Sequence, residues 1–227
     1  MVNYEIEIKS LVGGKLQAQA LVEKMKQSDP ALFFAGKHNQ LNHYFVKGNL
    51  MVLRSKLEPH LMADKQQEFD DLLAHAEDFK EFSVRTRSAD GKVIFVIKVA
   101  IDDTTSSNGT ARQEFESGVY LTLDELDQIL VDCGFEYQAK WSREREEYKY
   151  KGLSVTVDKN AGYGYLAEFE SVIDDAAKAD VTKAKIREII EELGLQELNQ
   201  ARLARMFDYY NKHWQDYYGT DKTFNIE

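Results

Sequence analysis

The stretch Tyr4-Glu5-Ile6-Glu7-Ile8-Lys9 carries the pattern on which the fold prediction rests. Alternate side chains of a β-strand share a face, so Glu5, Glu7 and Lys9 lie on one face and the apolar residues on the other. A single strand of this kind is also typical of an edge strand with one face in water. The same pattern recurs in several other strands, and this recurrence is what argues for more than a solvated edge strand.

The recurring feature is charge collected on one face of each strand. A salt-bridged surface usually alternates its signs within a strand, whereas here acidic and basic residues are largely segregated into different strands. This segregation favours a binding site over a solvated surface. The cations are Lys9, Arg85, Arg87, Lys98, Arg112, Arg143 and Arg145, and the anions are Glu5, Glu7, Glu114, Glu116, Asp158, Glu168 and Glu170.

These residue types predict the chemistry of the site. Carboxylates two residues apart lie about 7 Å from each other along a strand, and a neighbouring strand brings another to within about 5 Å. Carboxylates that close repel one another unless a cation lies between them, and the hard ions Mg²⁺ and Mn²⁺ prefer such oxygen ligands. Guanidinium groups match phosphate oxygens. We therefore expect the charged faces to hold a divalent metal and a triphosphate group.

Strand-like runs dominate the chain, and helices punctuate them. Asp90-Gly91 predicts a hairpin, and Thr122 with Glu125 predicts a capping box that opens a helix ended by Gly134. Many short antiparallel strands with a few helices predict an α+β fold built on a β-barrel or strongly curved sheet. We expect strands at 3–10, 41–55, 81–88, 92–101, 111–119, 135–150, 153–158 and 164–173, and further helices at 15–27, 182–193 and 198–217.

The length of 227 residues suits a single domain. We expect the barrel over about 1–173, a helical insertion over about 58–80 and C-terminal helices over about 180–218. The last helix carries an apolar and aromatic stripe, which indicates a packing face, either in the core or in a homodimer.

Composition excludes several classes of function. A net charge of -10 and a pI near 5.1 argue against a protein that coats long nucleic acids. Cys133 is the only cysteine, so an intrachain disulfide and a thiolate metal site are excluded. Neither a signal pattern nor a membrane-spanning run is present, so we expect a cytoplasmic protein without membrane contact.

The charged motifs, taken in order, resemble those of the CYTH superfamily, the triphosphate tunnel metalloenzymes. The resemblance covers about residues 3–173 and implies an eight-stranded antiparallel tunnel that acts on small triphosphate-bearing substrates with Mg²⁺ or Mn²⁺. The matching motifs are Glu5-x-Glu7-x-Lys9, Arg85-x-Arg87, Lys98, Arg112-x-Glu114-x-Glu116, Arg143-x-Arg145-x-x-Tyr148, Asp158 and Glu168-x-Glu170.

The resemblance also implies roles for these residues. Lys9 is expected to bind phosphate and to act as a base if neighbouring cations lower its pKa, and Tyr44 is a candidate partner for it. The strand of Tyr44, Asn42-His43-Tyr44-Phe45-Val46, lacks the acidic positions that the family often has there. The expected metal ligands are Glu5, Glu7, Glu114, Glu116, Asp158, Glu168 and Glu170. The expected phosphate-binding residues are Lys9, Arg85, Arg87, Lys98, Arg112, Lys140, Arg143 and Arg145. Lys140 is included because the family often has lysine at the position of Arg143, and Lys140 lies close to it in the sequence.

Three functions fit these motifs. The first is metal-dependent hydrolysis of a phosphoanhydride bond in inorganic tripolyphosphate, thiamine triphosphate or a nucleoside triphosphate. The second is a class IV adenylyl cyclase, in which the 3′-hydroxyl of ATP attacks its own α-phosphorus to give cyclic AMP and pyrophosphate. The third is a non-catalytic sensor of nucleotide or polyphosphate. No residue separates them, and none defines the preferred metal or the oligomeric state.

Overall fold

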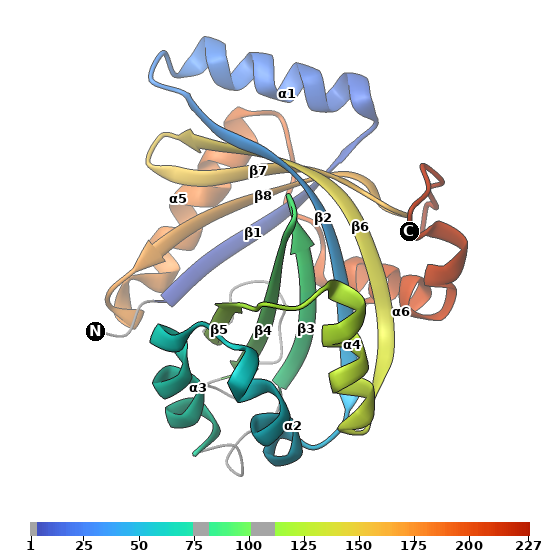
Figure 1. Cartoon of the computed structure of the whole chain (residues 1–227). Helices are drawn as coiled ribbons and strands as arrows, with labels where there is room; N and C mark the ends of the chain where they lie inside the picture. The colour runs from blue at the N-terminus through green and yellow to red at the C-terminus, as the bar shows by residue number, and fades with distance from the viewer. Residues whose placement is uncertain (1–3, 75–81, 101–111) are drawn as a thin grey trace. The chain divides into compact units, whose positions relative to one another are not determined.

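A computed structural model describes residues 4–74, 82–100 and 112–227 of the chain (Figure 1). Over these residues it contains eight strands and six α-helices. The strands are β1 (Tyr4–Gly13), β2 (Phe33–Lys47), β3 (Phe82–Ala89), β4 (Lys92–Ala100), β5 (Arg112–Gly118), β6 (Phe135–Tyr150), β7 (Leu153–Asn160) and β8 (Gly164–Ile173). The helices are α1 (Lys15–Ser28), α2 (Leu50–Leu57), α3 (Gln66–Leu73), α4 (Leu123–Asp132), α5 (Ala179–Glu192) and α6 (Gln200–Tyr217).

The strands belong to one sheet with the order β1-β8-β7-β6-β2-β3-β4-β5. The registers along it are antiparallel, as in the pairs of β1 with β8 and of β3 with β4. Among the described strands, β1 and β5 stand at the two ends of this hydrogen-bonded order. The predicted α+β class and the eight antiparallel strands are confirmed.

The described residues divide into two compact units. The first unit contains residues 4–39 and 142–227, and the second contains residues 40–74, 82–100 and 112–141. Strands β2 and β6 contribute residues to both units.

The core of the first unit lies on one face of β1, β6, β7 and β8. Ile8 of β1 and Phe169 of β8 pack there with Met25 of α1 and Ile186 of α5, and all four are buried. Because side chains alternate between the two faces of a strand, the charged residues next to Ile8 and Phe169 in the chain lie on the opposite face.

The second unit has the same division between an apolar and a charged face. Val84 of β3, Ile97 of β4 and Phe115 of β5 are buried against apolar side chains of α2, α3 and α4, including Leu53 and Leu126. The charged residues that alternate with them therefore lie on the face turned away from these helices.

Two of the predicted local motifs are confirmed. Asp90 and Gly91 both have positive φ angles, 49° and 81°, and they join β3 to β4 as a hairpin. The Thr122 side chain accepts a hydrogen bond from the Glu125 backbone N–H, and the Glu125 carboxylate accepts one from the Thr122 backbone N–H. Gly134, with a φ of 82°, follows the end of α4.

The strand predicted at 41–55 is wrong at both ends. Strand β2 begins at Phe33 and ends at Lys47, and helix α2 follows it. The Asn49 side chain caps this helix by accepting hydrogen bonds from the backbone N–H groups of Met51 and Val52 at 2.9 and 3.0 Å. The buried residues of α2 have helical spacing, which the β-like composition of the segment obscured; they are Leu50, Leu53 and Leu57.

Two further predictions concern residues 58–80 and the last helix. In the proposed insertion at 58–80, α3 buries Phe69, Leu72 and Leu73, whereas residues 75–80 lie outside the described part of the chain. In the last helix, Met206 and Tyr210 are buried, and the Tyr210 ring meets that of Tyr163 at 5.8 Å. The stripe on α6 is therefore a core face within the first unit. None of the described helices has the length and apolar character needed to cross a bilayer.

Candidate functional site

In the first unit, β1 and β8 place acidic and basic side chains directly opposite one another. Across this antiparallel pair Glu7 faces Glu170, and Lys9 faces Glu168. The Lys9 ammonium forms ion pairs with Glu7 and with Glu168, the latter at 3.2 Å. These side chains are only partly accessible, with 14% of Lys9 and 16% of Glu168 exposed.

Two arginines from β6 extend this charged face. Asp158 of β7 has no exposed side-chain surface and accepts hydrogen bonds from Arg143 at 2.9 Å and from Arg145 at 2.8 and 2.6 Å. Arg145 also donates to Glu168 at 2.7 Å. Asp158 was predicted as a metal ligand, but in this structure both of its oxygens bind arginine, so its position indicates a residue that orients the two guanidinium groups.

The charges of this cluster shift the acid–base properties of its members. Burial alone would raise the pKa of Glu168, but Lys9, Arg145 and Arg143 outweigh it and hold that pKa well below its ordinary value. Burial alone would lower the pKa of Arg145, but Glu168 and Asp158 raise it. Glu168 is therefore an anion and Arg145 a cation at any physiological pH.

The second unit holds its own cationic row on β3. Arg87 donates from Nε to the Oδ1 of Asn42 at 2.8 Å and from Nη1 to Glu116 at 2.9 Å. The Arg85 guanidinium lies 4.5 Å from the centre of the Tyr44 ring. Asn42 and Tyr44 are the direct cross-strand partners of Arg87 and Arg85.

A buried network lies on the opposite face of β2 and β3, under helix α4. Asp127 of α4 accepts hydrogen bonds from Thr86 at 2.6 Å and Tyr137 at 2.8 Å, and its other contact is His43 Nδ1 at 2.6 Å. Lys140 lies 3.9 Å from Asp127 and 4.1 Å from the centre of the Tyr137 ring. This placement gives no support to the predicted phosphate-binding role of Lys140, which lies with Asp127 rather than with Arg85.

Asp127 was not singled out by its sequence. Burial alone would raise its pKa, but hydrogen bonds with His43, Thr86 and Tyr137 outweigh it and hold the pKa below the ordinary 3.8. The one signal in the sequence was its position three residues before the buried Leu130, on the apolar side of α4.

The remaining predicted residues take several positions. Glu5 is exposed, whereas Glu170 and Lys98 are half-buried. The backbones of Arg112 and Glu114 belong to β5, but their side chains lie outside what the structure describes. Lys9 belongs to the first unit and Tyr44 to the second, so their catalytic pairing stays a prediction.

The donor chemistry on β1 and β8 fits a hard divalent cation. Glu5, Glu7, Glu168 and Glu170 offer only carboxylate oxygens, which are the ligands that Mg²⁺ and Mn²⁺ prefer. In the side-chain arrangement described for residues 4–74, 82–100 and 112–227, no three acidic, histidine or cysteine side chains form a ready-made metal cluster. Lys9 instead makes ion pairs with two of these carboxylates.

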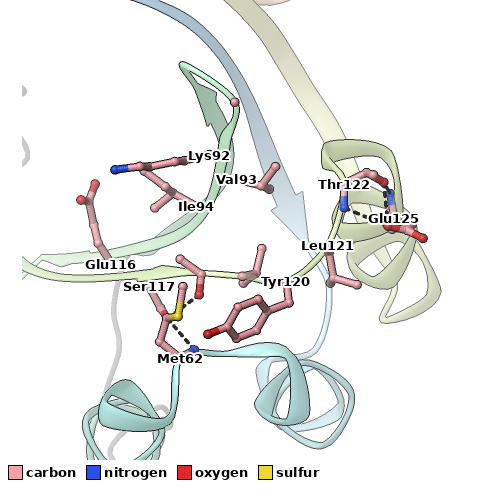
Figure 2. Close-up of a pocket in the computed structure, with 13 residues that line it drawn as sticks. Met62, Lys92, Val93, Ile94, Glu116, Ser117, Tyr120, Leu121, Thr122 and Glu125 are labelled. Atoms are coloured by element: carbon pink, nitrogen blue, oxygen red, sulfur yellow. Dashed lines mark hydrogen bonds between the residues drawn. The ribbon is translucent and has the colours of Figure 1, made fainter.

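A pocket of about 650 Å³ lies beside Glu116 in the second unit. Figure 2 shows Tyr120 and Met62 on one side of it and the β4 residues Lys92 and Ile94 on the other. Ser117 of β5, which also lines the pocket, accepts a hydrogen bond from the Met62 backbone N–H at 3.4 Å. Because Glu116 also binds Arg87, the pocket adjoins the cationic row of this unit.

Comparison with solved structures shows that the fold has been seen before. A conserved hypothetical protein from Pyrococcus furiosus has a TM-score of 0.60 and 19% identity over 85% of this chain and 92% of its own. A putative adenylate cyclase from Vibrio parahaemolyticus has a TM-score of 0.56 and 16% identity, covering 86% and 91% of the two chains. The putative adenylyl cyclase HpAC1 from Hippeastrum, which reveals a dominant triphosphatase activity, has a TM-score of 0.53 and 16% identity, covering 90% and 96%.

Fold and site together define an α+β protein whose strands carry acidic and basic residues on the face turned away from the helices. The family model of the CYTH domain matches residues 3–204, so the chain belongs to the CYTH family. This family acts on triphosphate-bearing small molecules and generally depends on divalent metal ions. A search of curated proteins found no match.

Proposed function

We propose that this protein hydrolyses a phosphoanhydride bond of a small triphosphate with the help of Mg²⁺ or Mn²⁺. The observation that carries the proposal is the partly buried anion Glu168, which contacts both Lys9 and Arg145 on the charged face of the first unit. Glu7 of β1 and Glu170 of β8 lie directly opposite each other in this pair of strands. This face combines oxygen donors for a metal with cations for phosphate.

Each group has a role in this proposal. Glu7, Glu168 and Glu170, with Glu5, would hold the divalent ion, which neutralises charge on the phosphate chain. On the first unit, Lys9, Arg143 and Arg145 bind phosphate oxygens. On the second unit, Arg85 and Arg87 form a separate cationic row of the same phosphate-binding chemistry. A water oxygen bonds to the terminal phosphorus and releases a proton to the solvent, while the anhydride P–O bond breaks and the leaving diphosphate keeps the electron pair. Such chemistry depends mainly on positioning and electrostatic stabilisation.

Adenylyl cyclisation is the second candidate, and the pocket beside Glu116 is the observation that favours it. The pocket is lined by Tyr120, Met62 and Ile94, and these side chains suit a flat, largely apolar group such as a nucleobase. In that reaction the substrate's own 3′-hydroxyl replaces water and attacks the α-phosphorus, and pyrophosphate leaves.

A substrate panel separates these candidates. The purified protein is incubated with tripolyphosphate, thiamine triphosphate, ATP or GTP, each with Mg²⁺, Mn²⁺ or a chelator, and the products are separated. Hydrolysis predicts orthophosphate release that the chelator abolishes. Cyclic AMP and pyrophosphate from ATP would instead establish the cyclase, whereas binding without any product would leave a sensor.

A further inference from the structure

Asn42 is a neutral residue among the charged side chains of the second unit. It is fully buried, at 0% exposure. It shares a face of β2 with Tyr44, two residues further along, and lies directly across from Arg87 of β3. Its neighbours on this face are therefore the cationic residues that we assign to phosphate binding.

The hydrogen bond with Arg87 fixes how the Asn42 amide is oriented. The Arg87 side chain can only donate hydrogen bonds, so the group that faces it at 2.8 Å must be the amide oxygen. The NH₂ end of Asn42 therefore points away from Arg87, and the arginine prevents the amide from flipping.

Two buried donors on this face have no acceptor among the residues that the structure describes. They are Nδ2 of Asn42 and Nε of Arg85. A buried donor without an acceptor is destabilising, and native proteins rarely keep one unless a ligand or water completes it. Because this face carries the guanidinium groups of Arg85 and Arg87, its donors attract an acceptor with negative charge.

We infer that Asn42 is a phosphate-binding residue, whose Nδ2 donates a hydrogen bond to a non-bridging oxygen of the substrate's phosphate chain. The inference rests on the proposed function, because it assumes that the ligand of this face is a triphosphate. Arg87 holds the amide in place, and Arg85 adds a second buried donor to the same face.

The inference explains why an amide suits this position better than a carboxylate. Aspartate at position 42 would still accept a hydrogen bond from Arg87, but it would bring a negative charge and no donor toward the phosphate. Asparagine accepts from Arg87 through one atom and keeps a donor for the ligand on the other.

The test is tripolyphosphate binding to the full chain, measured by calorimetry with and without Mn²⁺. We expect Asn42→Asp to weaken binding roughly 10- to 100-fold, the usual range for a lost hydrogen bond to a charged group. Asn42→Leu, which removes both donor and acceptor, should weaken it as well. The matched control is Asn49→Asp, because it adds the same charge in the same unit and retains the cap of α2; it should bind as the wild type does.

The outcomes separate this inference from the proposed function. Equal binding by the wild type and Asn42→Asp overturns the inference, even if the wild type hydrolyses tripolyphosphate. Weaker binding by Asn42→Asp, in a wild type that binds but forms no product, supports the inference and overturns hydrolysis. If Asn42→Leu fails to fold by circular dichroism, Asn42→Asp decides alone, since its carboxylate still pairs with Arg87.

Discussion

Asp127 and Asp158 are buried carboxylates with different surroundings. Asp127 joins helix α4 to β2, β3 and β6 through His43, Thr86 and Tyr137. The Asp158 carboxylate binds Arg143 and Arg145 and lies on the charged face of the first unit. The first therefore fixes the fold behind the cationic row, whereas the second fixes side chains of the candidate site itself.

Asp127→Asn should destabilise the protein at pH 7 by about 2–4 kcal/mol, because a buried charged acceptor of several hydrogen bonds is lost. The folded-state pKa of Asp127 lies below the 3.8 of an unperturbed carboxyl. Its stabilisation is therefore complete above about pH 4 and is lost as the pH falls through the folded pKa. Urea unfolding should therefore show a smaller difference in the free energy of unfolding between wild type and variant at pH 3 than at pH 7.

The control for this change is Asp132→Asn on the same helix, where the carboxylate is exposed. It should alter the free energy of unfolding by less than about 0.5 kcal/mol. If the difference in the free energy of unfolding between wild type and Asp127→Asn stays constant from pH 7 to pH 3, the ionised carboxylate of Asp127 does not stabilise the fold.

Asp158→Asn should destabilise the first unit by about 3–5 kcal/mol, because Arg143 and Arg145 would lose their buried counter-charge. Asp221→Asn makes the same change at a carboxylate that is 85% exposed and pairs with Lys159. That variant should lose less than about 1 kcal/mol. If urea unfolding shows equal losses of stability in the two variants, the buried contacts of Asp158 with Arg143 and Arg145 contribute no more to stability than an exposed ion pair does.

The turn between β2 and α2 depends on a close approach of the Gly48 backbone to the Phe135 ring. Gly48 has a φ of 76°, and a Cβ placed there would lie 2.2 Å from the Phe135 ring. Gly91, in the hairpin between β3 and β4, has a φ of 81°, and no atom of the described residues other than its chain neighbours lies within 4 Å of a Cβ placed there. The two glycines thus share a backbone conformation and differ in the space around them.

Alanine at each position separates the cost of the left-handed backbone conformation from the cost of crowding by Phe135. Gly91→Ala should lose about 1–2 kcal/mol from the left-handed backbone alone. Gly48→Ala should lose about 1–3 kcal/mol more, because Phe135 must move. The melting temperatures of both variants are compared by thermal unfolding. Similar melting temperatures would show that the Phe135 ring can move without loss of stability.

The sequence predicted most elements but not every boundary. Strands β6 and β8 match the predicted ranges 135–150 and 164–173, since their alternation of residues is long and regular. Strand β2 was extended too far because Val52 and Leu53 suit a strand as well as a helix. The helix was recognisable only from the Asn49 cap and the spacing of the buried leucines.

The positive charge of the proposed phosphate-binding residues opposes the net charge of the chain. The protein has a net charge of -10, yet its strands present arginines and lysines that are largely buried against carboxylates. Binding of a polyanion must therefore come from local cations and a metal, not from a general basic field.

The same contrast explains what the sequence could reveal about the site. Charged residues two apart were visible as a pattern, and the structure places Glu7, Lys9, Arg145 and Glu168 on one face. Asn42 was missed because the pattern recognises charge, and a neutral amide carries none. Its significance comes from burial and from the hydrogen bond of Arg87, which depend on the pairing of two strands that are distant in the sequence.

Hydrolysis by this protein is tested most directly by the initial rate of phosphate release from tripolyphosphate with Mn²⁺ or Mg²⁺, compared between wild type and Glu168→Gln. The variant keeps the size of the side chain and removes the charge that contacts Lys9 and Arg145. We predict turnover by the wild type that a chelator abolishes, and a loss of about 100-fold or more in the folded variant. Full activity in Glu168→Gln, or a wild type that releases no phosphate with either metal, would contradict this prediction.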